Sequence, residues 1–323
     1  MKEYIFKRLI MTVFVVISAA FLIFTIMYFI PGDPARLILG ADATAAQVEA
    51  KREMLGLNQP YLVRLGSFLS NVFLHFDLGT SWVTNTSIVS GLESRFPRTF
   101  LLGTLCVLTS TVIGLPIGIT SAVHHHKWQD KSFMVMAMTC ISMPDFWLAM
   151  MLTLVFSLKL NLLPSFGIGS WKCYVLPVIS GSVQGIGSLA RQTRSSMLEV
   201  YRSDYVTTAR AKGVPEGRVI RKHMLANALI PIITTIGGLF GSAICGTIVI
   251  EQVFSMPGIG TYLSTAINAR DYPVLQGSVI VMAVLIAVIM LIVDLVYAWV
   301  DPRIKAQYVA QNKKCGRRRK KNG

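Results

Sequence analysis

The sequence predicts an all-α membrane protein with six transmembrane helices and both chain termini in the cytoplasm. Apolar residues make up 53% of the 323 residues, charged residues make up 15%, and the mean hydropathy is +0.56. Soluble domains contain about 45–50% apolar and about 25% charged residues. Long apolar stretches recur along the chain, and the segments between them differ sharply in Lys and Arg content. The composition therefore argues against a soluble enzyme.

Residues 1–30 are predicted to form a retained N-terminal transmembrane helix. The run at 9–30 holds 22 uncharged residues, and about 20 suffice to cross the hydrocarbon core of a bilayer. The run is too long for the apolar region of a signal peptide, and a Pro-Gly-Asp-Pro turn follows it at 31–34.

Five further spans are expected within a core that covers residues 99–300. The span at 174–190 is the weakest, because it is rich in Gly and contains Pro177 and Gln184. Such a segment needs neighbouring helices or a watery cavity to satisfy its backbone. The five expected spans lie at 99–123, 133–158, 174–190, 225–250 and 274–293.

The Lys and Arg residues predict how the chain is oriented. Of the 31, 22 fall on the side that holds both termini and the loops at 124–132 and 191–224, and 9 fall on the other side. Basic loops remain in the cytoplasm. Both termini are therefore expected there, as an even number of spans requires, and Asp294 at the end of the last span is expected to pair with an interfacial Arg or Lys.

The long first loop, residues 31–98, is predicted to be an extracytoplasmic helical structure. Thr44 is placed to cap a helix that runs to Leu55 and ends at Gly56, and a second helix is expected at 60–73. At the other end of the chain, residues 301–323 form a basic cytoplasmic tail that is expected to rest on anionic membrane lipids. Nucleic-acid binding is the alternative, but membrane topology already accounts for the charge.

Three Gly-x-x-x-Gly pairs fall within the expected spans. This spacing lets helices approach closely, and in a chain with 25 glycines it can also be incidental. The pairs are Gly114/Gly118, Gly181/Gly185 and Gly237/Gly241.

The loop at 191–224 is expected to carry a short helix across the cytoplasmic end of the bundle. Ser203 or Asp204 can cap this helix, Gly213 can adopt the left-handed conformation that ends it, and Pro215 with Glu216 can start the next. Small and basic residues alternate along it, giving a surface suited to a partner's groove; a solvated connector is the alternative. The predicted contact residues are Asp204, Tyr205, Thr208, Ala209, Arg210, Ala211, Lys212 and Gly213.

Asp145 is the charged residue placed deepest inside an expected span. Pro144 before it removes a helical hydrogen bond and kinks that span. Intramembrane charges commonly mark a functional path, so Asp145 is a candidate to attract an amino group or a cation along an aqueous path. Capping the second half of a broken helix is the competing interpretation.

A second candidate group follows the fifth span on the outer side. Glu251 precedes the Pro257-Gly-Ile-Gly260 stretch, whose Pro257, Gly258 and Gly260 suit a re-entrant turn that closes the path. A simple outer loop is the alternative.

The sequence lacks several common enzyme motifs, and its cysteine and histidine residues are not spaced for metal binding. The sequence has no Gly-Lys dipeptide and so no phosphate-binding P-loop, no His-Glu-x-x-His and no Gly-x-Ser-x-Gly. The five cysteines are scattered, and the adjacent residues His124, His125 and His126 would point in different directions on a helix. We therefore expect no catalytic, cofactor or metal residues in this chain.

The chain resembles the permease subunits of ATP-binding-cassette (ABC) importers, in the branch that takes up dipeptides, oligopeptides or nickel. Ala209 and Gly213 match the family's Glu-Ala-Ala-x-x-x-Gly coupling motif, while Thr207 and Thr208 replace its Glu and first Ala. The other matching motifs are Pro31-Gly-Asp-Pro34, Leu55-Gly-Leu-Asn-Gln-Pro60, Phe76-Asp-Leu-Gly-Thr-Ser-Trp82, His223-x-x-x-Asn-Ala228, Glu251-x-Val-Phe-x-x-Pro-Gly-Ile-Gly260 and Arg270-Asp-Tyr-Pro273.

The resemblance implies a type I ABC importer permease fold in the bacterial cytoplasmic membrane. It implies a second homologous permease subunit, two ABC ATPase subunits that bind ATP and Mg²⁺, and an extracytoplasmic substrate-binding protein. The expected function is to form half of a pathway for short peptides; nickel import by the same machinery is the alternative. A passive channel is disfavoured because the sequence lacks a filter-like repeat, and a membrane enzyme because Asp145 has no second acid or base beside it.

Overall fold

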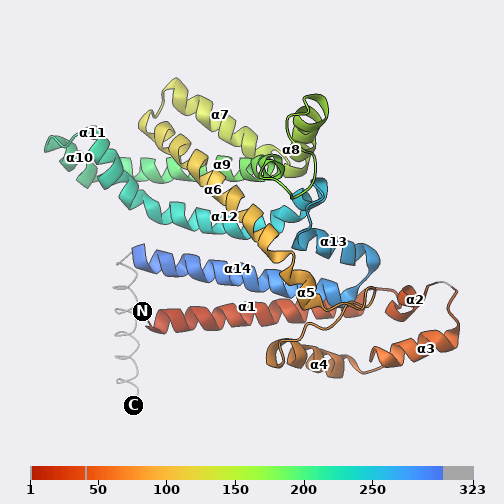
Figure 1. The fold of residues 1–323 in the computed structure, drawn as a ribbon. Helices are drawn as coiled ribbons and strands as arrows, with labels where there is room; N and C mark the ends of the chain where they lie inside the picture. The colour runs from red at the N-terminus through yellow and green to blue at the C-terminus, as the bar shows by residue number, and fades with distance from the viewer. Residues whose placement is uncertain (1, 41, 301–323) are drawn as a thin grey trace, which may run out of the picture.

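The computed structural model describes residues 2–40 and 42–300, which fold almost entirely into helices (Figure 1). The predicted basic tail at 301–323 lies outside the described residues. The helices are α1 (Lys2–Phe29), α2 (Pro34–Leu39), α3 (Ala45–Met54), α4 (Tyr61–Leu74), α5 (Ile88–Glu93), α6 (Phe96–Val123), α7 (Trp128–Ser142), α8 (Asp145–Leu152), α9 (Lys172–Tyr201), α10 (Asp204–Ala211), α11 (Glu216–Arg218), α12 (Ala226–Val253), α13 (Ile259–Ala269) and α14 (Tyr272–Val300), with π-helical turns η1 (Thr153–Lys159) and η2 (Val219–Leu225).

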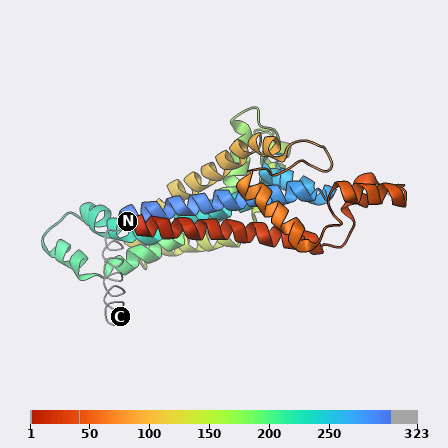
Figure 2. The ribbon, with the colours of Figure 1, turned by 90° about the horizontal axis from the view of Figure 1, so that it is seen from below.

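The long helices form an elongated bundle with a different set of short helices at each end (Figures 1 and 2). α1 and α14 run side by side, next to a group made of α6, α7, α9 and α12. The start of α1 lies at the same end as α10 and α11, called here the α10 end, and α2–α5 and α13 lie at the opposite end, called here the α13 end. The loop at 191–224 and the beginning of the chain therefore share one end, as the topology prediction requires.

Five helices are long and apolar enough to cross a membrane, and a bent pair brings the number of possible spans to six among the described residues. The bent pair is α7 with α8 and η1, whose axes differ by 96° at Pro144. The expected third span at 133–158 is therefore not one kinked helix but two separate helices. The expected fourth span is stronger than its composition suggested, because α9 is continuous from Lys172 to Tyr201 despite Pro177.

The close contact between α6 and α9 explains why the glycine-rich helix is stable. A Cβ atom on Gly114 would lie 2.8 Å from the backbone oxygen of Ile186, and one on Gly181 would lie 2.8 Å from the Cys106 sulfur. Each helix thus contributes one Gly-x-x-x-Gly pair to the same interface, where it packs against larger residues of the other helix. The Ser110 hydroxyl donates across this interface to the Ser182 carbonyl at 3.0 Å. The pair at Gly237/Gly241 packs instead against α14.

The segment at 31–98, called here the loop module, contains the two predicted helices. Thr44 and Gln47 form a reciprocal capping box at the start of α3, and Gly56 follows that helix with a φ of +64°. α4 begins after Pro60 and packs on α1, where the Tyr61 and Thr25 hydroxyls are 2.7 Å apart.

The loop module and α1 are both attached to α14. Asp271, immediately before α14, accepts hydrogen bonds from the Ser81 hydroxyl and from the Trp82 backbone N–H, the latter at 3.1 Å. Near the α10 end, Arg8 of α1 donates to Asp294 of α14 at 2.8 Å. The predicted pairing of Asp294 with a basic residue is confirmed.

Candidate functional site

The first candidate site is the surface of α10. Ser203 stands at the N-cap position, but its hydroxyl donates to the Val200 carbonyl at 2.6 Å and makes no capping bond to α10. Gly213 follows the helix with a φ of +73°, the left-handed conformation predicted for it, and Pro215 immediately precedes α11. The two short helices are therefore placed as expected, without the expected side-chain cap.

The residues predicted on α10 divide between two faces. Val206 and Ala209 are buried in an apolar cluster with Met197, Val219 and Met224. Ala209 is thus an anchor that holds α10 on the bundle and is not available to a partner's groove. The exposed residues of the predicted set are Asp204, Tyr205, Thr208, Ala211, Lys212 and Gly213.

Arg210 is held in place by neighbours on both sides. Its guanidinium donates to the two Glu216 carboxylate oxygens at 2.6 and 3.1 Å and lies 4.4 Å from the centre of the Tyr201 ring. The hydrogen bonds to Glu216 raise the pKa of Arg210 above its ordinary value. The ion pair between Arg210 and Glu216 stabilises the turn between α10 and α11. Because the charge of Arg210 is already paired, this residue contributes more to the rigidity of the surface than to the electrostatic attraction of a partner.

The second candidate site is a pocket of about 290 Å³ between α6, α8, α9 and α12, within the bundle. Asp145, the first residue of α8, lines it, and one carboxylate oxygen is buried without a hydrogen-bond partner. The capping bond considered as an alternative is absent from the start of α8. The other polar lining side chains are Ser110, Gln184, Ser188, Ser242 and Thr247.

Gln184 compensates for the break before Asp145. Its side-chain amide donates to the Met143 carbonyl at 2.9 Å, where the helical hydrogen-bond pattern stops. A polar residue that seemed to weaken the fourth span therefore supports the broken third one.

The third candidate site is a buried carboxylate at the α13 end. Glu251 is 1% exposed and accepts hydrogen bonds from the Thr99 hydroxyl at 2.6 Å and from the Thr261 backbone N–H at 3.1 Å. Gly258 and Gly260 pack directly against Glu251, so that any Cβ there would overlap its carboxylate. Pro257 accepts a hydrogen bond from Arg98 at 3.3 Å through its carbonyl. The predicted residues therefore form one connected group, which sequence reasoning had left without Thr99 and Arg98.

Of the three adjacent histidines, His125 belongs by its side chain to a charged cluster near the α10 end. Asp130 is buried and accepts hydrogen bonds from Arg194 of α9 at 2.5 and 2.7 Å and from the Ser121 hydroxyl at 2.5 Å. His125 Nδ1 lies 3.1 Å from the same carboxylate. Among the described residues, no group of three or more His, Cys, Asp and Glu side chains is arranged to hold a metal ion.

Comparison with known proteins shows which family this chain belongs to. A family model described as "Binding-protein-dependent transport system inner membrane component" matches residues 114–306, and its N-terminal counterpart matches residues 1–103. The chain is 40% identical over 305 residues to the glutathione transport system permease protein GsiC of Salmonella typhimurium, covering 94% of this chain and 99% of the relative. The GsiC protein of Escherichia coli K12 is 38% identical with the same coverage.

A solved structure supports the fold independently of close sequence similarity. The chain resembles the inward-facing MetNI methionine ABC transporter with a TM-score of 0.57 at 16% identity, over 65% of this chain and 95% of that one. The fold and the relatives define a class: a non-catalytic, multi-pass inner-membrane permease subunit of an ABC importer. Within it, the chain belongs to the binding-protein-dependent inner membrane components, in the dipeptide, oligopeptide and nickel branch. Members of this class work with ATPase and substrate-binding partners.

Proposed function

We propose that this chain forms half of the translocation pathway for short peptides and peptide-like molecules, together with a second, homologous permease subunit. The observation that carries the proposal is the near full-length similarity to permeases named for glutathione, itself a tripeptide. The pocket at Asp145 supports the proposal, because its wall includes polar side chains of the kind that a path for zwitterions requires.

A wet pathway is needed because peptides carry charges at both ends. Moving one ion from water into a medium of low dielectric costs on the order of 20 kcal/mol by the Born estimate. In the proposed path, the unpartnered oxygen of Asp145 attracts the peptide's ammonium group as it passes. Glu251 with Thr99, Gly258 and Gly260 holds the turn before α13, which closes the path at the outer face.

The α10 end is proposed to face the cytoplasm. There the exposed face of α10 sits in a groove of an ATPase subunit, one of two that bind ATP and Mg²⁺, and an extracytoplasmic binding protein delivers the substrate at the α13 end. Because Ala209 and Val206 fasten α10 to η2 and α9, a displacement of the ATPase is transmitted to the spans as a rigid-body movement.

Reconstitution in proteoliposomes tests the proposal. The chain, its partner permease, both ATPases and the binding protein are combined, and uptake of labelled dialanine, glutathione and Ni²⁺ is measured with and without ATP. ATP-dependent accumulation of a peptide is expected. Uptake of Ni²⁺ alone would assign the metal as cargo, and undiminished peptide flux after the ATPases are omitted would identify a channel.

A further inference from the structure

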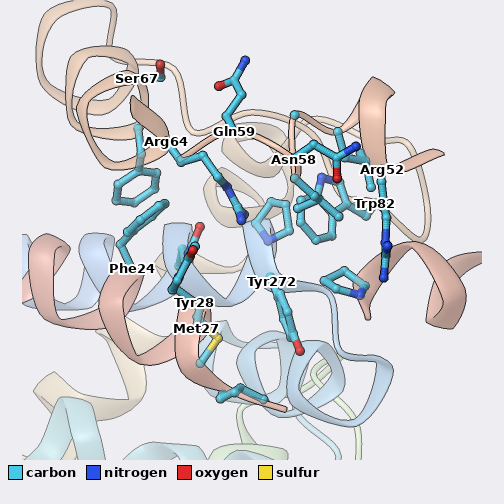
Figure 3. Close-up of a pocket in the computed structure, with 18 of the residues that line it drawn as sticks. Phe24, Met27, Tyr28, Arg52, Asn58, Gln59, Arg64, Ser67, Trp82 and Tyr272 are labelled. Atoms are coloured by element: carbon cyan, nitrogen blue, oxygen red, sulfur yellow. The ribbon is translucent and has the colours of Figure 1, made fainter. Parts of the chain in front are cut away.

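A second and larger cavity lies at the α13 end, outside the candidate sites described above. Its volume is about 620 Å³, and it is enclosed by the end of α1, by α4, by residues 52–59 and by the start of α14 (Figure 3). Ligand pockets for small molecules commonly measure about 300–1,000 Å³. The cavity is therefore of a size that accepts a small molecule.

The charges that line this cavity are not balanced. Arg52 is neutralised, because it pairs with Asp33 at 2.9 Å and with Glu49 at 3.4 Å. Asp33 is the acidic lining residue, so its charge is already satisfied. Arg64 also lines the cavity, and within the described ranges no acidic side chain pairs with it. The lining thus carries one uncompensated positive charge.

Arg64 is half-buried, and burial lowers its pKa below the ordinary arginine value. Its guanidinium carbon lies 5.4 Å from the centre of the Tyr28 ring, which compensates only in part for the lost water. Figure 3 shows the side chain extending into the cavity, with Tyr28 on one side and Asn58 and Trp82 on the other. A half-buried guanidinium without an acidic partner is well suited to bind a carboxylate through two parallel hydrogen bonds.

The remaining walls suit an organic molecule better than a simple anion. Trp82 and Tyr272, whose ring centres are 5.9 Å apart, form an aromatic wall. The side-chain amides of Asn58, Gln59 and Gln276 also line the cavity and can both donate and accept hydrogen bonds. A short peptide presents this combination: a carboxylate, backbone amides and side chains.

We propose that this cavity is a binding site for the C-terminal carboxylate of a short peptide, with Arg64 as the anchoring residue. The inference rests on the proposed function, because it takes the peptide as the transported substrate. The site lies at the end where the binding protein is proposed to release its cargo, so it would hold a peptide before entry into the membrane-embedded path.

The test uses the two permease subunits with both ATPases in lipid nanodiscs, without the binding protein. Binding of labelled dialanine is compared with that of dialanine carboxamide, which lacks the carboxylate, for wild type, Arg64→Gln and Arg36→Gln. Arg36 is a matched control, because it is an exposed arginine of the same loop module that does not line the cavity. The wild type and Arg36→Gln are expected to bind the acid at least tenfold more tightly than the amide, and Arg64→Gln is expected to lose this preference.

Equal binding of acid and amide by the wild type would overturn the proposal without any variant having to fold. Unchanged acid preference in Arg64→Gln would overturn it as well. A loss of binding-protein docking in Arg64→Gln, with no acid preference in the wild type, would assign the cavity to a carboxylate of the binding protein instead. ATP-driven uptake is measured with the same wild-type protein reconstituted in proteoliposomes together with the binding protein. This measurement separates the two proposals, because peptide uptake in the absence of an acid preference removes only this site.

Discussion

Thr99 and Glu251 are 152 positions apart in the chain, yet a hydrogen bond of 2.6 Å joins their side chains at the α13 end. The same Thr99 hydroxyl oxygen accepts a hydrogen bond from the Ile259 backbone N–H at 2.8 Å. One hydroxyl group therefore connects three helices: α6, the end of α12 and the start of α13.

Replacing Thr99 by Val should destabilise the protein by about 2–4 kcal/mol, because it leaves a buried carboxylate short of one donor and a buried N–H without an acceptor. Thr99→Ser, which retains the hydroxyl, should be destabilised by less than half as much as Thr99→Val. The thermal unfolding midpoint in detergent is measured for both variants and for the wild type. Equal midpoints for Thr99→Val and wild type would show that this hydrogen bond does not hold the three helices together.

Gly118 is predicted to be essential to the contact between α6 and α9. A Cβ there would lie 2.5 Å from both the Ala190 carbonyl oxygen and the Thr193 Cβ, whereas Gly238 has open space around it. Gly118→Leu should therefore cost more than the usual 1–3 kcal/mol of overpacking, and Gly238→Leu should be nearly neutral. Size-exclusion profiles and unfolding midpoints report the difference, and similar behaviour of the two variants would contradict the packing described here.

The ion pairs of Asp130 and Glu216 should differ greatly in importance. Asp130 has a side chain 5% exposed and several donors, whereas the Glu216 side chain is 54% exposed. Asp130→Asn leaves Arg194 without its carboxylate and should destabilise by about 3–5 kcal/mol, and Glu216→Gln should change stability by about 0–1 kcal/mol. Chemical unfolding measures the free energy of unfolding of both variants. A larger loss of stability for Glu216→Gln than for Asp130→Asn would contradict this ranking.

Gly213→Val should uncouple ATP hydrolysis from transport. A β-branched residue at a φ of +73° costs at least about 1–2 kcal/mol and would reorient α10 relative to α11. Gly217→Val is the control, because Gly217 lies within α11 and lacks a positive φ. The ratio of ATP hydrolysed to peptide transported is expected to rise several-fold in Gly213→Val alone, and a wild-type ratio would remove this turn from the mechanism.

Asp145→Asn should reduce peptide uptake several-fold while assembly stays intact. The substitution removes the charge and keeps the shape of a side chain that lines the bundle pocket. Uptake kinetics in proteoliposomes and the yield of assembled complex are measured together. Unchanged uptake kinetics would show that Asp145 has no role in the path. Its carboxylate would then act only through a favourable electrostatic interaction with the N-terminus of α8.

Local features of the structure could be predicted from the sequence. The Thr44 cap, the left-handed Gly213 and the position of the helix interruption at Pro144 each depend on residues within a few positions, and the structure contains all three. At Pro144 the predicted kink is a complete break between two helices. The predicted pairing of Asp294 also succeeded, because a charge at the end of a span requires a partner in the interfacial region.

Features that depend on contacts distant in sequence could not be predicted. Thr99 and Arg64 have no neighbouring motif that marks them, since their significance comes from α12, α13 and α1 in three dimensions. The burial of Ala209 also could not be predicted, because its position in the motif does not show which side of α10 packs on the bundle. The 96° bend likewise depends on α9, whose Gln184 satisfies the exposed backbone.

The attachments of α14 have a mechanical consequence. The ion pair of Arg8 with Asp294 joins α14 to α1, and the hydrogen bond of Ser81 to Asp271, the residue before α14, joins it to the loop module. Its contact with α12 is apolar and includes Val293 packed against Gly237. Directional polar bonds thus connect α14 to α1 and to the loop module, whereas its contact with α12 depends on the close fit of apolar side chains against glycine. If the inner helices move during transport as proposed, we therefore expect the displacement relative to α1 and α14 to change the packing of Val293 against Gly237 before it breaks the polar bonds of α14.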